Sequence, residues 1–238
     1  MRADISAIAD RFPDLQIAFV TATGLTIPEH RPAVLDDHIK AVEADAAARF
    51  RDVAMPDIPG VAVWRQAYKD FGIKKTSYRC SVERLVRKVA RDGALAGINP
   101  FVDAYNAVSL AHVFPLGADD LDRIAGDLSF RPSRENDTFY ALGQEPETND
   151  PPKLGEIVYA DDEKVLCRRW NWYQDARSPV TPQTTRAVVT IQSLGPGDLE
   201  AAIADLSALL REHCGAMCGI IVLSRERPQA ELPIASTS

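Results

Sequence analysis

The segment NPFVDAYN at residues 99–106 constrains the fold of this chain more than any other stretch. Asn99 is typical of a helix N-cap, because its side-chain oxygen can accept a hydrogen bond from a free backbone N–H. Pro100 suits the first helical position, where no backbone N–H is needed. We therefore expect a helix from Pro100 to about His112, followed by a carboxylate-rich loop over residues 115–122.

Polar side chains share one face of this expected helix. Asp103 and Asn106 are three residues apart and project from the same side, with Tyr105 beside them. Such groups either satisfy the backbone groups of nearby loops or bind a polar ligand at the mouth of a pocket. The spacing alone leaves both interpretations open.

The acids of the following loop are interpreted as solvated carboxylates, at least one of which caps a short helix. They are Asp119, Asp120 and Asp122. This interpretation assigns them no chemistry.

The expected elements run from helices in the first half of the chain to short strands in the second. Early segments repeat apolar residues at helical spacing, whereas turn residues separate short β-rich segments later. This order predicts an α+β fold with one continuous core, as a single domain of residues 1–225 with a disordered tail at 226–238. The expected helices cover residues 32–50, 60–71, 81–91, 100–112 and 198–213, and the expected strands cover residues 16–23, 126–130, 138–142, 156–160, 164–170, 186–192 and 219–223.

A strongly basic segment interrupts an otherwise acidic chain. The whole chain carries a net charge of −7, which argues against indiscriminate nucleic-acid binding. On the expected helix at 81–91 the cations lie opposite the apolar face. They form either a solvated outer face, which charge alone favours, or a ridge that contacts phosphates. Seven basic residues accompany one acid, Glu83, in this segment: Lys74, Lys75, Arg79, Arg84, Arg87, Lys88 and Arg91.

A second cluster, CRRWNWY at residues 167–173, mixes arginines with aromatic side chains. Such a set can stack on nucleobases and contact phosphates. It can equally be one strand whose alternate side chains fill the core, with Trp170 and Trp172 on one face. The residues alone favour the core interpretation.

Several kinds of chemistry lack support in this sequence. It contains no Gly-x-Ser-x-Gly elbow, Walker loop, Gly-x-Gly-x-x-Gly or His-Glu-x-x-His motif, and its four histidines do not suggest a hydrolytic triad. The four cysteines are too scattered for a disulfide scaffold, and Cys214 and Cys218 lack the second pair typical of a zinc site. We expect no metal or other cofactor, no DNA partner, no membrane span and a cytoplasmic location.

The polar blocks and the strands that follow them resemble the B3/B4 domain of the phenylalanyl-tRNA synthetase β subunit, over residues of about 75–195. The motif Asn-Pro-x-Val-Asp-x-x-Asn falls on residues 99–106, and Pro-Leu-x-Ala-x-Asp-Leu-Asp falls on residues 115–122. Three further matches follow in the family's order: Gly-x-Leu-x-x-Arg at 126–131, Ile-Val-x-Ala-Asp at 157–161 and Val-Thr-x-x-Thr at 180–184.

The resemblance implies a B3/B4-type fold, a barrel-like mixed β core flanked by helices, with an editing pocket between them. In the synthetase this domain hydrolyses the ester of a wrongly attached amino acid, tyrosine on the phenylalanine tRNA. Stand-alone relatives are aminoacyl-tRNA deacylases that act in trans, and one group clears canavanine from the arginine tRNA. The chain is therefore expected to be a trans-editing deacylase whose partner is a mischarged tRNA, with tRNA(Arg) as the first candidate.

Residue roles follow from this resemblance. Asn106 and Tyr105 would orient the ester and the attacking water. Asp103 or Glu156 would bind a cationic side chain or an amino group. The pocket would be shaped by Arg168, Trp170 and Asn171. The tRNA phosphates would be contacted by Lys74, Lys75, Arg79, Arg84, Arg87 and Lys88.

The chain departs from the family at three places. Gly117 stands where the synthetase has histidine, residues 169–172 stand where it has Gly-Gly, and residues 187–190 stand where it has a glutamate-bearing strand. The missing histidine favours an alternative, a non-catalytic tRNA-binding module that kept the fold. A pocket protein that binds a small molecule and no tRNA is a third interpretation. Nothing in the sequence indicates an oligomeric state.

Overall fold

Two open β-sheets and a layer of helices build the structure, a computed structural model that describes residues 1–73, 75, 77–143 and 149–234. The central sheet is four-stranded and antiparallel, in the order β3 (Leu116–Asp120), β8 (Arg186–Ser193), β2 (Gln16–Thr23) and β9 (Met217–Leu223). The outer sheet is six-stranded, in the order β10 (Gln229–Glu231), β1 (Arg2–Asp4), β4 (Leu128–Pro132), β5 (Ile157–Ala160), β6 (Val165–Arg168) and β7 (Tyr173–Gln174).

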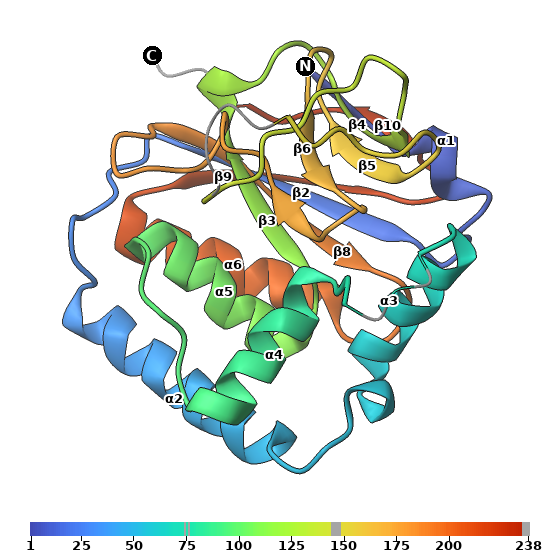
Figure 1. The fold of residues 1–238 in the computed structure, drawn as a ribbon. Coiled ribbons are helices and arrows are strands. Elements are labelled where there is room, and N and C mark those ends of the chain that lie inside the picture. Colours follow the sequence, from blue (N-terminus) through green and yellow to red (C-terminus); the bar gives the residue numbers. More distant parts are fainter. Residues whose placement is uncertain (74, 76, 144–148, 235–238) are drawn as a thin grey trace.

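The helices lie mainly on one side of the central sheet, and the outer sheet lies over its other side (Figure 1). The α-helices are α1 (Ser6–Ala9), α2 (Ala33–Phe50), α3 (Pro59–Asp70), α4 (Ser81–Asp92), α5 (Pro100–His112) and α6 (Leu199–Cys214), with 3₁₀ turns η1 (Met55–Asp57) and η2 (Leu121–Arg123). The expected α+β class is confirmed, but the two sheets do not close into a barrel. No helix in the described ranges is long and apolar enough to cross a membrane.

Strand β2 is buried on both faces, which fixes the order of the layers. Because side chains alternate along a strand, Ile17 and Phe19 face the outer sheet, while Ala18 and Val20 face α5 and α6. The ring of Phe19 lies 6.2 Å from that of Phe130 on β4, in an edge-to-face arrangement. The central sheet therefore belongs to two hydrophobic cores at once.

The helix predicted from Asn99 and Pro100 is confirmed as α5. The side chain of Asn99 accepts a hydrogen bond from the backbone N–H of Val102 at 3.0 Å, as an N-cap does. Its amide also donates to the carbonyl of Val180 at 3.2 Å, which joins the start of the helix to the segment before β8. The helix ends at Val113, whose φ of 58° lies in the left-handed region.

Residues 116–120 form strand β3, so the expected loop at residues 115–122 is wrong over most of its length. Asp119 and Asp120 are buried, which also corrects the expectation of solvated acids. The expected cap is confirmed, because Asp120 accepts a hydrogen bond from the N–H of Asp122 at 3.0 Å at the start of η2. Pairing with β8 along the whole strand accounts for the difference, since a lone sequence does not reveal that partner.

Two further strand expectations fail for local reasons. The strand expected at 164–170 ends at Arg168, because Arg169 and Trp170 adopt φ values of 46° and 67°, which a strand does not tolerate. The segment 138–142 contributes one isolated bridge from Ala141 and no strand. The sequence analysis also missed β1 and α1, which are too short to show a period.

The disordered tail expected from residue 226 is wrong for residues 226–234. Residues 229–231 form β10 beside β1, and the N–H of Leu232 donates to the carbonyl of Met1 at 3.0 Å. Residues 235–238 lie outside the described part of the chain.

The buried position of Phe19 yields a stability prediction. We expect Phe19→Ala to lower the free energy of unfolding by about 3–5 kcal/mol, because it opens a cavity between the two sheets. The measurement is urea-induced unfolding. Val34→Ala is the control, since the Val34 side chain is 66% exposed on α2 and its loss should change stability by less than about 1 kcal/mol. A loss below about 1 kcal/mol for Phe19→Ala would contradict the layer packing.

Candidate functional site

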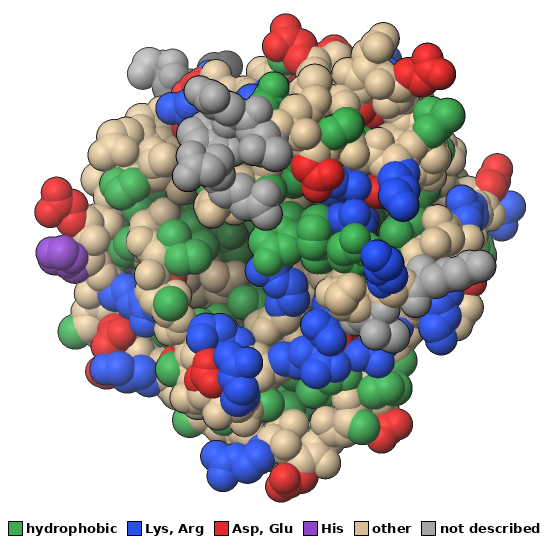
Figure 2. Space-filling model, in the orientation of Figure 1, with side chains coloured by type: hydrophobic (Ala, Val, Ile, Leu, Met, Phe, Trp, Pro, Cys, Tyr) green, Lys and Arg blue, Asp and Glu red, His purple; other side chains and the backbone are tan. Residues whose placement is uncertain are grey.

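A cavity of about 610 Å³ lies where α4 and α5 meet the edges of the two sheets. Its wall includes residues from β3 and β8 of the central sheet and from β5, β6 and β7 of the outer sheet. Its polar lining residues other than Lys and Arg include Ser81, Tyr105, Asn106, Asp119, Tyr159, Asn171, Tyr173, Gln174, Thr190 and Gln192. Figure 2 looks onto this side of the molecule and shows Lys and Arg side chains gathered over α4, next to a hydrophobic surface.

Strand alternation places the acid of β3 inside this cavity. Leu116 and Ala118 pack toward the helices, so Gly117 and Asp119 face the opposite side, where they line the cavity. Gly117 pairs with Thr190 on β8, which lines the same wall. Among the described residues of the lining, Asp119 is the one carboxylate.

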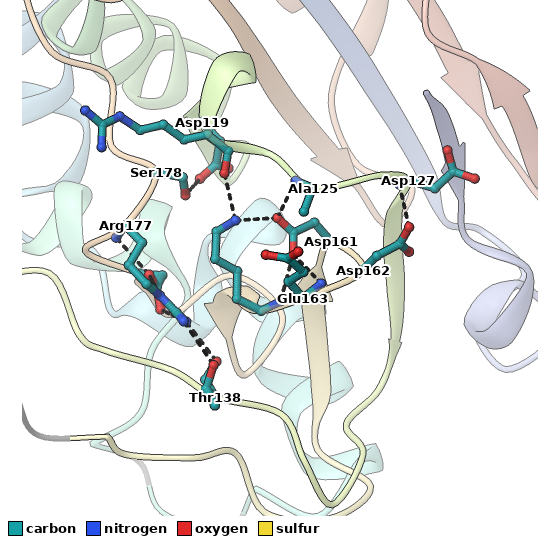
Figure 3. Close-up of polar contacts among 12 residues, drawn as sticks. Asp119, Ala125, Asp127, Thr138, Asp161, Asp162, Glu163, Arg177 and Ser178 are labelled. Atoms are coloured by element: carbon teal, nitrogen blue, oxygen red, sulfur yellow. Dashed lines mark hydrogen bonds and ion pairs between the residues drawn. The ribbon is translucent and has the colours of Figure 1, made fainter.

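The two oxygens of Asp119 have different environments. Oδ1 accepts hydrogen bonds from Ser178 Oγ at 2.6 Å and from Gln174 Nε2 at 3.1 Å. Figure 3 shows Ser178 next to Asp119. Oδ2 accepts no hydrogen bond from any residue in the described ranges. Burial raises the pKa of Asp119 to about 7, although the bonds from Ser178 and Gln174 act in the other direction.

A chain of amides crosses the cavity wall from α3 to β8. The hydroxyl of Tyr68 donates to Asn171 Oδ1 at 2.9 Å, and Asn171 Nδ2 donates to Gln192 Oε1 at 3.0 Å. Gln192 Nε2 in turn donates to the hydroxyl of Thr190 at 3.3 Å. These bonds fix the orientation of three polar side chains, because each accepts or donates in one direction. Asn171 lines the cavity, and its role toward a substrate stays a prediction.

Tyr105 and Asn106 project from α5 into the same cavity. Burial raises the pKa of the Tyr105 phenol, with a further contribution from the nearby Asp119 carboxylate, so the phenol stays neutral at ordinary pH. The side chain of Asn106 is partly exposed and makes no hydrogen bond to another residue of the described part of the chain. Both are thus placed where they could touch a ligand, and their catalytic roles stay predictions.

Asp103 does not line this cavity. Its carboxylate accepts a hydrogen bond from Arg31 Nε at 2.7 Å and another from the N–H of Ile98 at 2.9 Å. The expectation that Asp103 binds a cationic substrate group does not fit this geometry, because Arg31 already occupies the carboxylate.

Glu156, Arg168 and Trp170 also lie outside the cavity lining. Arg168 donates to both carboxylate oxygens of Glu156 at 3.1 Å, so the two buried charges neutralise each other. Trp170 is fully buried, with its ring 4.7 Å from that of Phe12 and 5.1 Å from that of Trp64. Direct substrate contacts by these three residues do not fit the structure, and the core interpretation of Trp170 is confirmed.

The cations of the basic segment border the cavity and differ in how far they are paired. Glu83 is buried, and three arginines contact its carboxylate, namely Arg65, Arg79 and Arg87. Burial acts to raise the pKa of Glu83, but hydrogen bonds from Arg65 and Arg87 outweigh it and hold that pKa below its ordinary value. One carboxylate against three guanidinium groups leaves an excess of positive charge beside the cavity.

The remaining cations of α4 lie closer to solvent. The Arg84 guanidinium lies 4.0 Å from the centre of the Tyr173 ring and donates to the carbonyl of Trp172 at 2.9 Å. Lys88 pairs with Asp92 at 2.8 Å on the same helix. Arg79, Arg84, Arg87, Lys88 and Arg91 all line the cavity, whereas Lys75 lines a neighbouring hollow and Lys74 lies outside the described residues.

Sequence reasoning missed several cavity residues. The sequence indicates Asp119 only as a solvated acid and suggests no role for Tyr159, Thr190 or Gln192, all of which line the cavity. The hydroxyl of Tyr159 is buried and has no hydrogen-bond partner in the described ranges. The alternation of side chains in β3 and β8 could have revealed this face once the two strands were known to pair.

No group of three or more His, Cys, Asp and Glu side chains in the described ranges is arranged to hold a metal ion. The four cysteines are free thiols, and Cys167 lies at the cavity wall.

The comparisons with known proteins agree with the motifs. A model of the B3/4 domain family matches residues 63–215, which is more than half of the chain. The chain belongs to the B3/4 domain family. A solved N-terminal fragment of the phenylalanyl-tRNA synthetase β-subunit from Pyrococcus horikoshii is similar, with a TM-score of 0.44 and 12% identity. The similarity covers 87% of this chain and 49% of that fragment, so the chain spans about half its length. No curated protein matches the chain significantly.

The raised pKa of Asp119 predicts a specific pH dependence of stability. An ordinary aspartate has a pKa of 3.8, and here the pKa is about 7, so the folded protein holds the proton more tightly than the unfolded chain. The resulting stability is fully present below pH 3.8 and is lost as the pH rises through about 7. Asp119→Asn removes this dependence. We expect the difference in free energy of unfolding, Asp119→Asn minus wild type, to be roughly 2–4 kcal/mol larger at pH 8 than at pH 5.

Urea unfolding of both proteins at the two pH values measures this difference. Asp122→Asn is the control, because the Asp122 side chain is 47% exposed and is paired with Arg186 outside the cavity. Its stability relative to the wild type should be the same at both pH values. A pH-independent difference for Asp119→Asn as well would contradict the raised pKa.

Proposed function

We propose that the protein is an aminoacyl-tRNA deacylase that hydrolyses the ester of a mischarged tRNA in trans. One observation carries this proposal: a single cavity combines polar side chains, with Asp119 as the one carboxylate of the described lining, and cations along one border. The first feature suits an aminoacyl ester, and the second suits the phosphates next to it. Membership of the B3/4 domain family supports the same reaction, because the motifs shared with the synthetase editing domain include Asn106 of this cavity.

The chemistry is modest because an aminoacyl ester is already activated. A site needs to hold the ester, order one water and stabilise the oxyanion that forms. The unpaired amide of Asn106 can donate to the ester oxygen, and the neutral Tyr105 phenol can hold the water or the ester. Asn171, held between Tyr68 and Gln192, provides a rigid wall against which the amino acid packs.

The border of cations is proposed to contact tRNA phosphates. Arg84, Arg87 and Lys88 follow one side of α4, and Arg79 precedes the helix. Lys74 and Lys75 would extend this contact along the same segment. Such contacts position the tRNA without reading its sequence, and they weaken as salt increases.

We propose canavanyl-tRNA(Arg) as the first substrate to test. A synthetase pocket separates near-isosteric amino acids by only about 1–3 kcal/mol, so an arginine analogue needs a second selection step. The amides and hydroxyls of Asn171, Thr190 and Gln192 suit a side chain rich in hydrogen-bond donors better than the ring of tyrosine.

One observation favours the alternative of a non-catalytic tRNA-binding module. A Cβ atom placed on Gly117 would meet no other atom within 4 Å, so a histidine would have room at this position, and the chain lacks one. A binding module would keep affinity for tRNA and hydrolyse no ester.

Asn106→Ala separates the two functions. For a deacylase we expect the rate of ester hydrolysis to fall by about 10²–10³-fold, since one donor to the developing oxyanion is lost. The affinity for uncharged tRNA should stay unchanged. The assay follows ester loss from tRNA(Arg) charged with canavanine or arginine and from tRNA(Phe) charged with tyrosine. Asn136→Ala is the matched control, because Asn136 is exposed and lies outside the cavity lining. No hydrolysis by the wild type, together with tRNA binding, would support the binding module instead.

Lys88→Ala tests the proposed phosphate contacts. We expect weaker binding of every tRNA by a similar factor, and a slope of log affinity against log salt that is shallower by about 1. Filter binding at several salt concentrations measures this slope. Lys40→Ala on α2 is the control, because Lys40 is exposed and paired within its own helix. An unchanged slope for Lys88→Ala would exclude this contact.

A further inference from the structure

The carboxylate of Asp119 is held in a manner that leaves one oxygen available. Ser178 and Gln174 both donate to Oδ1, and no residue of the described ranges donates to Oδ2. Since the side chain lines the cavity, Oδ2 is the atom that can meet a ligand or a water.

Space for a reacting group lies next to this carboxylate. Gly117 is two residues away on the same face of β3, and nothing lies within 4 Å of where its Cβ would be. Tyr159 also lines the cavity, and its hydroxyl is buried without a partner among the described residues. A polar ligand or water in this space can donate to Asp119 Oδ2.

We infer that Asp119 is the general base that activates water in the proposed deacylation, with Oδ2 as the atom that takes the proton. The inference rests on the proposed function and extends it to a residue that the family motif leaves unspecified, the variable position in Pro-Leu-x-Ala-x-Asp. Asn106 and Tyr105 then hold the ester, while Asp119 acts on the water.

The steps balance without any other reactant. Asp119 Oδ2 takes one proton from water as the water oxygen bonds to the ester carbonyl carbon. The tetrahedral intermediate then breaks its bond to the ribose oxygen. That oxygen leaves with the proton that Asp119 carried. The products are the free amino acid and the tRNA with its ribose hydroxyl, and Asp119 returns to its carboxylate form.

The environment of Asp119 matches this role. A pKa of about 7 lets the group accept a proton from water and release it again near neutral pH. Since the base acts as a carboxylate, the rate rises with pH as Asp119 loses its proton. The titratable and charged groups that couple to it or share its cavity are Tyr105 on α5, Tyr159 on β5, Lys164 before β6, Cys167 on β6, Asp175 after β7, and the cations of α4, Arg84, Arg87 and Lys88.

The test is the pH profile of kcat/KM between pH 5.5 and 8.5, with the aminoacyl-tRNA that the wild type hydrolyses fastest. We expect a wild-type profile that rises with a midpoint near 7. Asp119→Asn keeps an oxygen that can accept the bonds of Ser178 and Gln174 but removes the base. We expect it to lower the rate by about 10²–10⁴-fold and to abolish the rise.

Ser178→Ala gives a readout that a structural role would not produce. The bond from Ser178 lowers the pKa of Asp119, so its loss should move the midpoint to higher pH while most of the rate at high pH remains. Asp122→Asn is the control for a neutralised neighbour and should keep the wild-type profile.

The outcomes of these experiments test the role of Asp119 and the proposed deacylase function separately. A folded Asp119→Asn variant that keeps the wild-type rate and profile overturns the inference and leaves the deacylase intact. A wild type that hydrolyses none of the charged tRNAs overturns the proposed function and the inference with it. Thermal unfolding of each variant shows which of them are folded.

Discussion

The pairing of β2 with β8 is the constraint on which the rest of the structure depends. The eight residues of β2 run antiparallel to the eight of β8, and each strand is buried on both faces. This pairing decides which side chains face the helices and which face the outer sheet. A shift by one residue would exchange the two sets, so that Thr190 and Gln192 would leave the cavity and enter the helical core.

Local signals predicted much of the fold. The N-cap at Asn99 and the apolar period of α4 set two helices correctly, because each depends on neighbours in the sequence. Predictions failed for elements whose bounds depend on contacts with residues far away in the sequence. Asp119 belongs to a strand only because β8 lies beside it, and the strand expected through Trp170 ends early because that ring is packed between Phe12 and Trp64.

The predictions for the candidate site also divide into residues that line the cavity and residues that are held by distant partners. Asn106, Tyr105 and Asn171 line the cavity, and of the three only Asn106 is a residue of the family motif. Asp103 and Glu156 do not line it, because each is paired with an arginine. Asp103 pairs with Arg31 and Glu156 pairs with Arg168, and the sequence gives no signal for either pair. A sequence does not show which cation lies beside a given carboxylate in the folded protein. Sequence reasoning therefore cannot separate a structural ion pair from a free acid.

The central sheet also has a consequence for how the chain is made. β2 ends at Thr23, yet its two neighbours begin at Arg186 and Met217. During synthesis β2, with apolar side chains on both faces, stays unpaired until nearly the whole chain has left the ribosome. The cavity cannot exist before that moment, since β8 supplies one of its walls. Nascent chains therefore expose an unpaired, aggregation-prone strand before they can complete the sheet. Chaperone capacity thus contributes to the yield of folded protein in a cell.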